Sequence, residues 1–229
     1  MYSVSSVGNA WIEQLIYFVD FEGSRSSGVL EYGVVGVLRG EIVQSNTRLC
    51  RATGTVRTED TAVHGLSGEM LASRRPFGEE WEFFAALRER GPLAAHYAGV
   101  ENSLLKSVWP YPRNSPDFAR ENERVIDWGP WIDTARLYAQ LYPALDSTAL
   151  ESLVQACGLQ PELDRAAARY CPGNRCCYHS ALYDALAGAL LLARLARDPK
   201  VAGWSTMQLL TFSTLDPRKR DALQQRELF

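Results

Sequence analysis

A chain of 229 residues with 46% hydrophobic and 22% charged residues is typical of a soluble globular protein with one large domain, or one domain and an appendage. The longest apolar run, residues 185–193, falls far short of the roughly 20 residues that span a bilayer, and the N-terminus lacks the pattern of a secretion signal. We therefore expect no membrane contact and a cytoplasmic location. The formal net charge of −3 argues against sequence-independent coating of nucleic acid, but it does not exclude a nucleic-acid enzyme.

The first part of the chain predicts three strands. Residues 15–22 form a hydrophobic run of the kind that makes a buried strand. Residues 29–38 and 41–49 predict two further strands, joined by a tight hairpin at residues 39–41. Three antiparallel strands that begin with the hydrophobic run would form half of a mixed sheet.

Helices alternate with short strands in the rest of the chain. The predicted elements are a helix at 79–90, a strand at 93–96, a helix at 100–108, a strand end at 131–134, a helix from 147 and a long helix at 178–197. Asp133 or Thr134 is expected to cap the helix that follows the strand end. Strands that alternate with helices after an antiparallel start predict an α/β fold with a mixed sheet.

Residues 109–130 are irregular and contain four prolines. Three arginines in this segment are candidates to face a substrate, because the guanidinium group suits bidentate phosphate contacts. They are Arg113, Arg120 and Arg124.

Three of the five cysteines crowd into residues 171–177, just before His179. Clustered cysteine and histidine side chains are typical zinc ligands, so a zinc site is one interpretation. The usual Cys-x2-Cys pairs are missing, which favours reduced thiols.

An acidic pair, Asp20 and Glu22, ends the hydrophobic run. Residues two apart on a strand point to the same face, so the two carboxylates project side by side. Neighbouring carboxylates repel each other unless a positive charge lies between them, and a divalent cation bound through oxygen ligands is the usual solution. The alternative is a strand that ends in a solvated acidic turn.

A second candidate group lies at the start of the long helix. Asp184 stands between Tyr183 and Ala185 in an apolar helix, where a carboxylate needs a partner. His179 is expected near the helix N-terminus, where the helix dipole disfavours the charged imidazole and so suits a neutral base. The alternative for His179 is a capping or surface histidine.

These residues fall into three motifs, namely Asp20-Phe21-Glu22, His96 with Glu101 five residues later, and His179 with Asp184 five residues later. In order and spacing the motifs resemble those of the DEDDh 3′–5′ exonucleases, which include the proofreading subunit of the bacterial replicative polymerase and oligoribonuclease. The segments 63–66 and 131–134 resemble the context of the motifs in that family. The resemblance covers about residues 14–197.

The resemblance implies a ribonuclease H-like fold, with a mixed five-stranded sheet flanked by helices. Residues 1–200 would form the exonuclease domain and residues 201–229 a C-terminal tail. The implied metal ligands are Asp20, Glu22, Glu101 and Asp184, which would hold two divalent ions, Mg²⁺ or Mn²⁺, with His179 as the general base. The residues implied to grip the terminal nucleotide are Gly23, Ser24, His64, Leu66 and Tyr97.

The implied reaction is the release of nucleoside 5′-monophosphates from single-stranded DNA or DNA 3′ ends, in repair or proofreading. An RNA-trimming enzyme is the alternative within this class, because the 2′-OH decides between the two polymers and the sequence does not show whether it is read. A nucleic-acid-binding module that has lost turnover is the alternative from another class.

Two positions depart from the family pattern. Glu101 stands where the family usually has aspartate, and its extra methylene predicts weakened activity or a preference for manganese, because magnesium tolerates poor geometry badly. Gly23 and Ser24 stand where the first motif usually continues with threonine. Either Ser24 replaces that hydroxyl, or the Gly23 N–H contacts the nucleotide directly.

The last residues include Gln225, Leu228 and Phe229. This pattern resembles the short peptide by which bacterial replication proteins dock on the sliding clamp, with two apolar anchors and one orienting amide. The tail would then bind a clamp or polymerase. The alternative is a tail that packs its own Leu and Phe on the domain.

Overall fold

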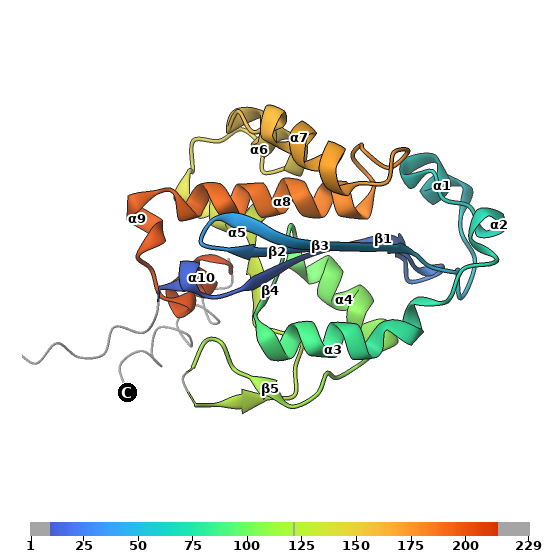
Figure 1. The fold of residues 1–229 in the computed structure, drawn as a ribbon, viewed down its shortest axis with the longest axis horizontal. Coiled ribbons are helices and arrows are strands. Elements are labelled where there is room, and N and C mark those ends of the chain that lie inside the picture. Colours follow the sequence, from blue (N-terminus) through green and yellow to red (C-terminus); the bar gives the residue numbers. More distant parts are fainter. Residues whose placement is uncertain (1–9, 121, 215–229) are drawn as a thin grey trace, which may run out of the picture.

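The computed structural model describes residues 10–120 and 122–214, which are arranged around one central sheet (Figure 1). The sheet has five strands in the order β3-β2-β1-β4-β7. The strands are β1 (Ile16–Ser24), β2 (Gly28–Leu38), β3 (Glu41–Leu49), β4 (Leu93–Ala95) and β7 (Trp131–Asp133).

The pairing of the strands confirms the predicted mixed sheet. β1 is antiparallel to β2, and β2 is antiparallel to β3, whereas β1–β4 and β4–β7 are parallel. The hairpin between β2 and β3 turns at Arg39 and Gly40, both with positive φ, as in a two-residue hairpin of primed type. β1, β3, β4 and β7 run in the same direction, so their C-terminal ends lie at one edge of the sheet.

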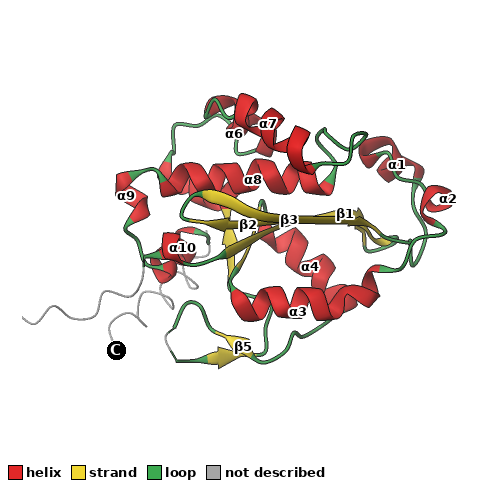
Figure 2. Ribbon diagram, viewed as in Figure 1, coloured by secondary structure: helices red, strands yellow, loops and turns green. Residues whose placement is uncertain are grey.

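Helices cover both faces of the sheet (Figure 2). One face carries α8 (Ala181–Ala196), which packs on β1 and β2 and is itself covered by α6 (Leu150–Ala156) and α7 (Gln160–Tyr170). The other face carries α3 (Trp81–Arg90) and α4 (Ala98–Val108). The remaining helices are α1 (Thr58–His64), α2 (Gly68–Leu71), α5 (Thr134–Leu141), α9 (Pro199–Ala202) and α10 (Thr206–Phe212), with short 3-10 turns at Trp11–Glu13 and Phe77–Glu80.

The core explains why β1 begins with a continuous apolar run, residues 16–19. Successive side chains of a strand point to opposite faces. Phe18 therefore enters the cluster beneath α8, whereas Tyr17 and Val19 enter the aromatic cluster beneath α3 that contains Phe84. β1 is thus buried on both faces, and its last residues leave the core at the shared edge of the sheet.

Several helix boundaries differ from the prediction. The long helix begins at Ala181 and not at 178, because His179 has φ of +63°, which a right-handed helix does not permit. The helix predicted from 147 begins at Leu150, and the sequence analysis missed α7 altogether. Asp133 is confirmed as the cap of α5, since its carboxylate accepts a hydrogen bond from the Arg136 N–H.

The irregular segment 109–130 contains a small hairpin of β5 (Ser115–Pro116) and β6 (Arg124–Val125). Its arginines bind within the protein. Arg113 lies over the Trp81 ring and pairs with Glu82 and Glu89, while Arg120 pairs with Asp117 and Glu123, and Arg124 donates to the Asn114 carbonyl. The expectation that these arginines face a substrate therefore gains no support.

Part of the predicted tail packs against the fold. α10 contacts α5 and β7, and Leu209 and Leu210 belong to the cluster beneath α8. The predicted boundary after residue 200 thus falls within α9, next to elements that share one core. The docking residues Gln225, Leu228 and Phe229 lie outside the described residues. No helix in the described part of the chain is long and apolar enough to cross a membrane.

A close approach of two backbones sets the position of α8. A Cβ added to Gly33 on β2 would lie 2.3 Å from the Ala181 carbonyl oxygen and 2.5 Å from the Leu182 Cα. We expect Gly33→Ala to lower the free energy of unfolding by about 1–3 kcal/mol, because the start of α8 must move away from the sheet. Urea unfolding measures this loss. Gly203→Ala is the control, since nothing lies within 4 Å of its added Cβ, and equal stability of the two variants would contradict the prediction.

Candidate active site

Four carboxylates come together where β1 leaves the core. Asp20 and Glu22 lie on β1, Glu101 in the first turn of α4, and Asp184 in the first turn of α8. The structure therefore brings one acidic side chain from each covering helix to the acidic pair of the strand. All four predicted ligands are in one cluster, and the charges of the other three raise the pKa of Asp20.

Burial and mutual repulsion perturb the titration of the whole cluster. Burial is the main cause of a pKa of about 8 for Glu22 and for Glu101, and the charge of a neighbouring carboxylate adds to it in each case. Burial also raises the pKa of Asp184 to about 7, although a hydrogen bond from the His179 backbone opposes the shift. The pKa of Asp20 lies well above its usual value for the same reasons. The Arg175 charge opposes the shift of Glu22 and of Asp184 but does not cancel it.

Two oxygen atoms of the cluster are buried without a hydrogen-bond partner among the described residues. They are Glu101 Oε2 and Asp184 Oδ1. Buried carboxylate oxygens normally find a donor, and an exception calls for an ion or another explanation. Because hard divalent cations prefer oxygen ligands, the residues present fit such ions. Glu101 therefore offers a ligand atom to the cluster despite its extra methylene.

His179 adjoins the acidic cluster from the loop before α8. Its backbone N–H donates to Asp184 Oδ2 at 2.9 Å, and its left-handed backbone turns the chain sharply just before the helix. One ring nitrogen of His179 and one oxygen each of Glu22 and Asp184 lie within 4.8 Å of one another. The histidine is exposed, so its ring faces both the cluster and solvent.

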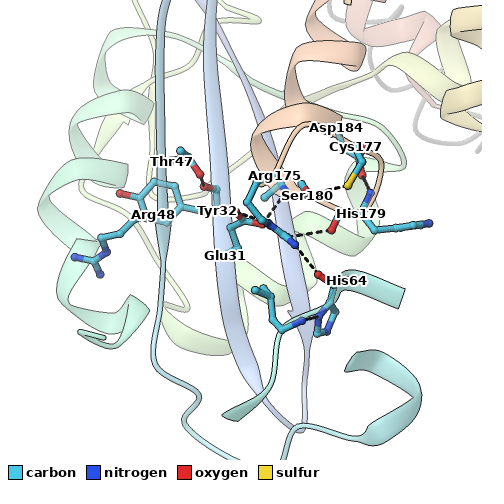
Figure 3. Close-up of polar contacts among 12 residues, drawn as sticks. Glu31, Tyr32, Thr47, Arg48, His64, Arg175, Cys177, His179, Ser180 and Asp184 are labelled. Carbon is cyan, nitrogen blue, oxygen red and sulfur yellow. Dashed lines mark hydrogen bonds and ion pairs between the residues drawn. The ribbon is translucent and has the colours of Figure 1, made fainter. Parts of the chain in front are cut away.

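An ion pair between Arg175 and Glu31 holds this loop in place (Figure 3). Glu31 on β2 is 2% exposed and also accepts the Ala181 N–H at 3.0 Å. The Arg175 guanidinium further donates to the His64 carbonyl at 2.7 Å and to the His179 carbonyl at 3.1 Å. Arg175 thereby ties β2, the end of α1 and the His179 loop to one another.

Sequence reasoning missed both residues of this pair. A signal for Glu31 was present, because a charged residue in the apolar run 29–38 needs a buried partner. Glu31 lies directly opposite Glu22 in the β1–β2 register, which makes it a fifth carboxylate at this edge. No pattern marked Arg175, which stands among the cysteines and turn residues of its loop.

A cleft of about 430 Å³ opens beside the acidic cluster. Residues 23–25 form one wall, and the first turns of α4, including Val100, form the other. Gly23 sits at a β-bulge with φ of +133°, and an added Cβ would lie 2.3 Å from the Gly28 carbonyl oxygen, so the position requires glycine. The Ser24 hydroxyl lies 2.9 Å from that of Ser26 and 3.1 Å from that of Ser27.

The other predicted nucleotide contacts are placed differently. Leu66 is buried in a small cluster with Leu30 and Leu71, so its side chain does not reach the surface. His64 is also buried; its Nδ1 accepts the Leu66 N–H, and its Nε2 has no partner among the described residues. Tyr97 is 38% exposed at the start of α4 and its hydroxyl contacts that of Thr148.

The cysteines before His179 are free thiols. Cys176 Sγ contacts the Pro172 carbonyl, whereas Cys177 Sγ contacts the Ser180 hydroxyl, so their sulfur atoms point to different partners. The metal-ligand group found in the described part of the chain includes no cysteine. The structure does not bring these cysteines and His179 together as one group of ligands.

Comparisons with known proteins agree with the predicted family fold. No protein-family model matches the chain. A segment is 27% identical over 134 residues to the PolC-type DNA polymerase III of Thermotoga maritima, and 26% identical to that of Thermotoga petrophila. The match covers 58% of this chain but only 9% of each polymerase.

Solved structures cover more of the chain. Exonuclease X in complex with 5′ overhanging duplex DNA has a TM-score of 0.62 and 21% identity, covering 87% of this chain and 99% of its own. This chain has the fold of exonuclease X. The nuclease domain of 3′hExo, a DEDDh family member bound to rAMP, has a TM-score of 0.58 and 15% identity, covering 82% and 94%. Escherichia coli exonuclease I with a dT13 oligonucleotide has a TM-score of 0.60 and 12% identity, covering 82% and 42%.

In the metal-free protein, the acidic cluster should make the folded state less stable as the pH rises. The folded state raises the pKa of Glu22 and Glu101 from 4.5 to about 8, so it favours their protonated forms. Their contribution to stability is present at low pH and is lost as the pH rises through 8. We therefore expect the free energy of unfolding in EDTA to fall between about pH 5 and pH 8.

Chemical unfolding in EDTA across this range measures the effect, and Mn²⁺ is expected to restore stability at the upper end. Glu22→Gln and Glu101→Gln serve as controls, because an amide does not titrate and the curves should flatten. Stability that rises with pH in the metal-free wild type would contradict the prediction.

Removing one member of the Arg175–Glu31 pair should cost more stability than removing both. We expect Arg175→Met to lower the free energy of unfolding by about 3 kcal/mol, because it leaves Glu31 buried and charged without a partner. The double variant Arg175→Met, Glu31→Gln removes both charges and should lose clearly less. Urea unfolding of the wild type, both single variants and the double variant completes the cycle, and additive losses would show that the pair is not coupled.

Proposed function

We propose that this chain is a metal-dependent 3′–5′ exonuclease that releases nucleoside 5′-monophosphates from single-stranded DNA or DNA 3′ ends. The observation that carries the proposal is the joint arrival of four carboxylates and His179 at one edge of the sheet, from β1, α4, α8 and the loop before it. Repair and proofreading are the processes that such an activity would serve.

Asp20, Glu22, Glu101 and Asp184 would hold two divalent ions, Mg²⁺ or Mn²⁺. Bound divalent ions supply Lewis acidity, which lowers the pKa of water and stabilises charge on phosphate oxygens. The raised pKa values and the unpartnered oxygens of the cluster support this assignment. Glu101 would reach the cluster with its longer side chain, from a helix whose start is held by Asp133.

His179 would act as the general base that removes a proton from the attacking water. Its ring nitrogen lies close to Glu22 and Asp184, and its backbone is fixed on two sides by Asp184 and Arg175. A general base must first lie within reach of the proton that it removes. These hydrogen bonds hold the His179 backbone in place for that purpose. The side chain stays exposed, which allows it to pass the proton to solvent.

The cleft beside the cluster would take the terminal nucleotide. Gly23 and Ser24 line it, and Val100 is 59% exposed on its opposite wall. Stacking of a base on apolar side chains is tolerant of sequence, so we expect little sequence preference. His64 and Tyr97 remain candidates for polar contacts with the nucleotide, whereas Leu66 would contribute through its backbone alone because its side chain is buried.

DNA is the first candidate substrate because exonuclease X and exonuclease I were solved with DNA, and because the polymerase match is to a DNA polymerase. The 3′hExo domain was solved with rAMP, which keeps RNA trimming as the second candidate. A binding module without turnover is the third. The tail residues Gln225, Leu228 and Phe229 stay a prediction of docking to a sliding clamp or polymerase.

Digestion of 5′-labelled single-stranded DNA and RNA of one sequence tests the proposal. With Mg²⁺ or Mn²⁺ we expect a ladder that shortens from the 3′ end and disappears in EDTA. His179→Ala should reduce the rate by about 10²–10⁴-fold, since that is the usual contribution of a general base. Asp20→Asn should abolish turnover because it removes a negative charge from the acidic cluster that would hold the metal ions.

Arg165→Ala is the matched control, because this exposed arginine on α7 lies outside the acidic cluster. Its rate should equal that of the wild type. The polymer that shortens faster identifies the substrate class. An oligonucleotide that binds but is never shortened with either metal would overturn the exonuclease in favour of the binding module.

A further inference from the structure

A second hollow, of about 550 Å³, lies on the other side of the Arg175–Glu31 pair. We call it the arginine groove, after the four arginines that line it. Arg48 comes from β3, Arg74 and Arg75 from the segment between α2 and the 3-10 turn at Phe77–Glu80, and Arg175 from the His179 loop. The rest of its lining consists of Glu31, Thr47, Leu49, Ser73, Pro172 and Asn174.

The groove continues directly from the active site. Glu22, Glu31 and Leu49 are paired in line across β1, β2 and β3, and both Glu31 and Leu49 line the groove. Neighbouring strands are about 4.8 Å apart, so the groove begins within roughly 10 Å of Glu22. Arg175 belongs to both places, because it lines the groove and donates to the His179 carbonyl.

The groove concentrates positive charge in a protein whose net charge is −3. Arg48 pairs with Glu80, Arg75 with Glu79 and Arg175 with Glu31. A guanidinium has five N–H donors, so a paired arginine keeps donors for a second anion. Arg74 is exposed, and its side chain has no acidic partner in the part of the chain that the structure describes.

We propose that the arginine groove binds backbone phosphates of the substrate strand next to its reacting 3′ end. The proposal rests on the proposed function: the terminal nucleotide would lie in the cleft beside Gly23, and the groove begins at Glu31, on another side of the same acidic cluster. Phosphate contacts position a strand without reading its bases, which suits an enzyme that shortens any sequence. The acidic cluster repels phosphates, and the groove offsets that repulsion with Arg74 and the spare donors of its neighbours.

The test compares Arg74→Glu with Arg165→Glu, two charge reversals at exposed arginines, of which only the first lies in the groove. Binding of 5′-labelled single-stranded DNA of about 20 nucleotides, longer than the usual site of one small domain, is measured in EDTA by fluorescence anisotropy over a range of salt. Arg74→Glu should weaken binding roughly tenfold and lower the slope of log K against log salt by about 0.7 for each lost phosphate.

Hydrolysis of the p-nitrophenyl ester of thymidine 5′-monophosphate, with metal present, separates the groove from the catalytic residues. This substrate has no upstream phosphates, so Arg74→Glu should hydrolyse it at the wild-type rate. Arg165→Glu should match the wild type in both assays.

Each failure has its own signature. Unchanged DNA affinity and salt slope in Arg74→Glu, or an equal loss in Arg165→Glu, would overturn the groove while leaving the exonuclease intact. A wild type that hydrolyses neither substrate but loses DNA affinity on Arg74→Glu would remove the proposed function and leave the groove as a nucleic-acid surface.

Discussion

The burial of four neighbouring carboxylates, together with their mutual repulsion, is the constraint on which the rest of this structure depends. The pKa is raised to about 8 for Glu22 and Glu101 and to about 7 for Asp184. The pKa of Asp20 is also raised. These groups lie at the end of β1 and at the starts of α4 and α8. Gathering them there lowers the stability of the metal-free fold and concentrates negative charge at one place. The surrounding contacts then make sense as means of holding that arrangement together, foremost the pair between Arg175 and Glu31.

The sheet and the acidic residues could be predicted from the sequence. β1 is apolar on both faces and ends in two carboxylates, a local pattern that needs no knowledge of distant contacts. Spacing within the chain was enough to connect Glu101 and Asp184 to that strand, through the resemblance to a family. Asp184 was also predicted from its surroundings, because a carboxylate within an apolar helix needs a partner.

Other features depend on contacts between distant segments and left little local trace. The start of α8 was misplaced because His179 adopts a left-handed backbone, in a loop tied to Glu31 and the His64 carbonyl by Arg175. The burial of the Leu66 side chain was not foreseen, because an exposed and a buried leucine look identical in sequence. Arg113 attracted attention by its type, yet Trp81 and two glutamates of α3 surround it.

One carboxylate links the two halves of the site scaffold. Asp133 accepts the N–H groups of Tyr97 and Ala98 at the start of α4 as well as the Arg136 N–H at the start of α5. Both helices therefore share one acceptor side chain at their starts, which ties the position of α4 to that of α5. The side chain at position 101 projects from the first turn of α4, so its length sets how far a carboxylate reaches from that helix. Aspartate at this position would hold its carboxylate one bond closer to the α4 backbone, whereas glutamate spans the extra distance with one more rotatable bond.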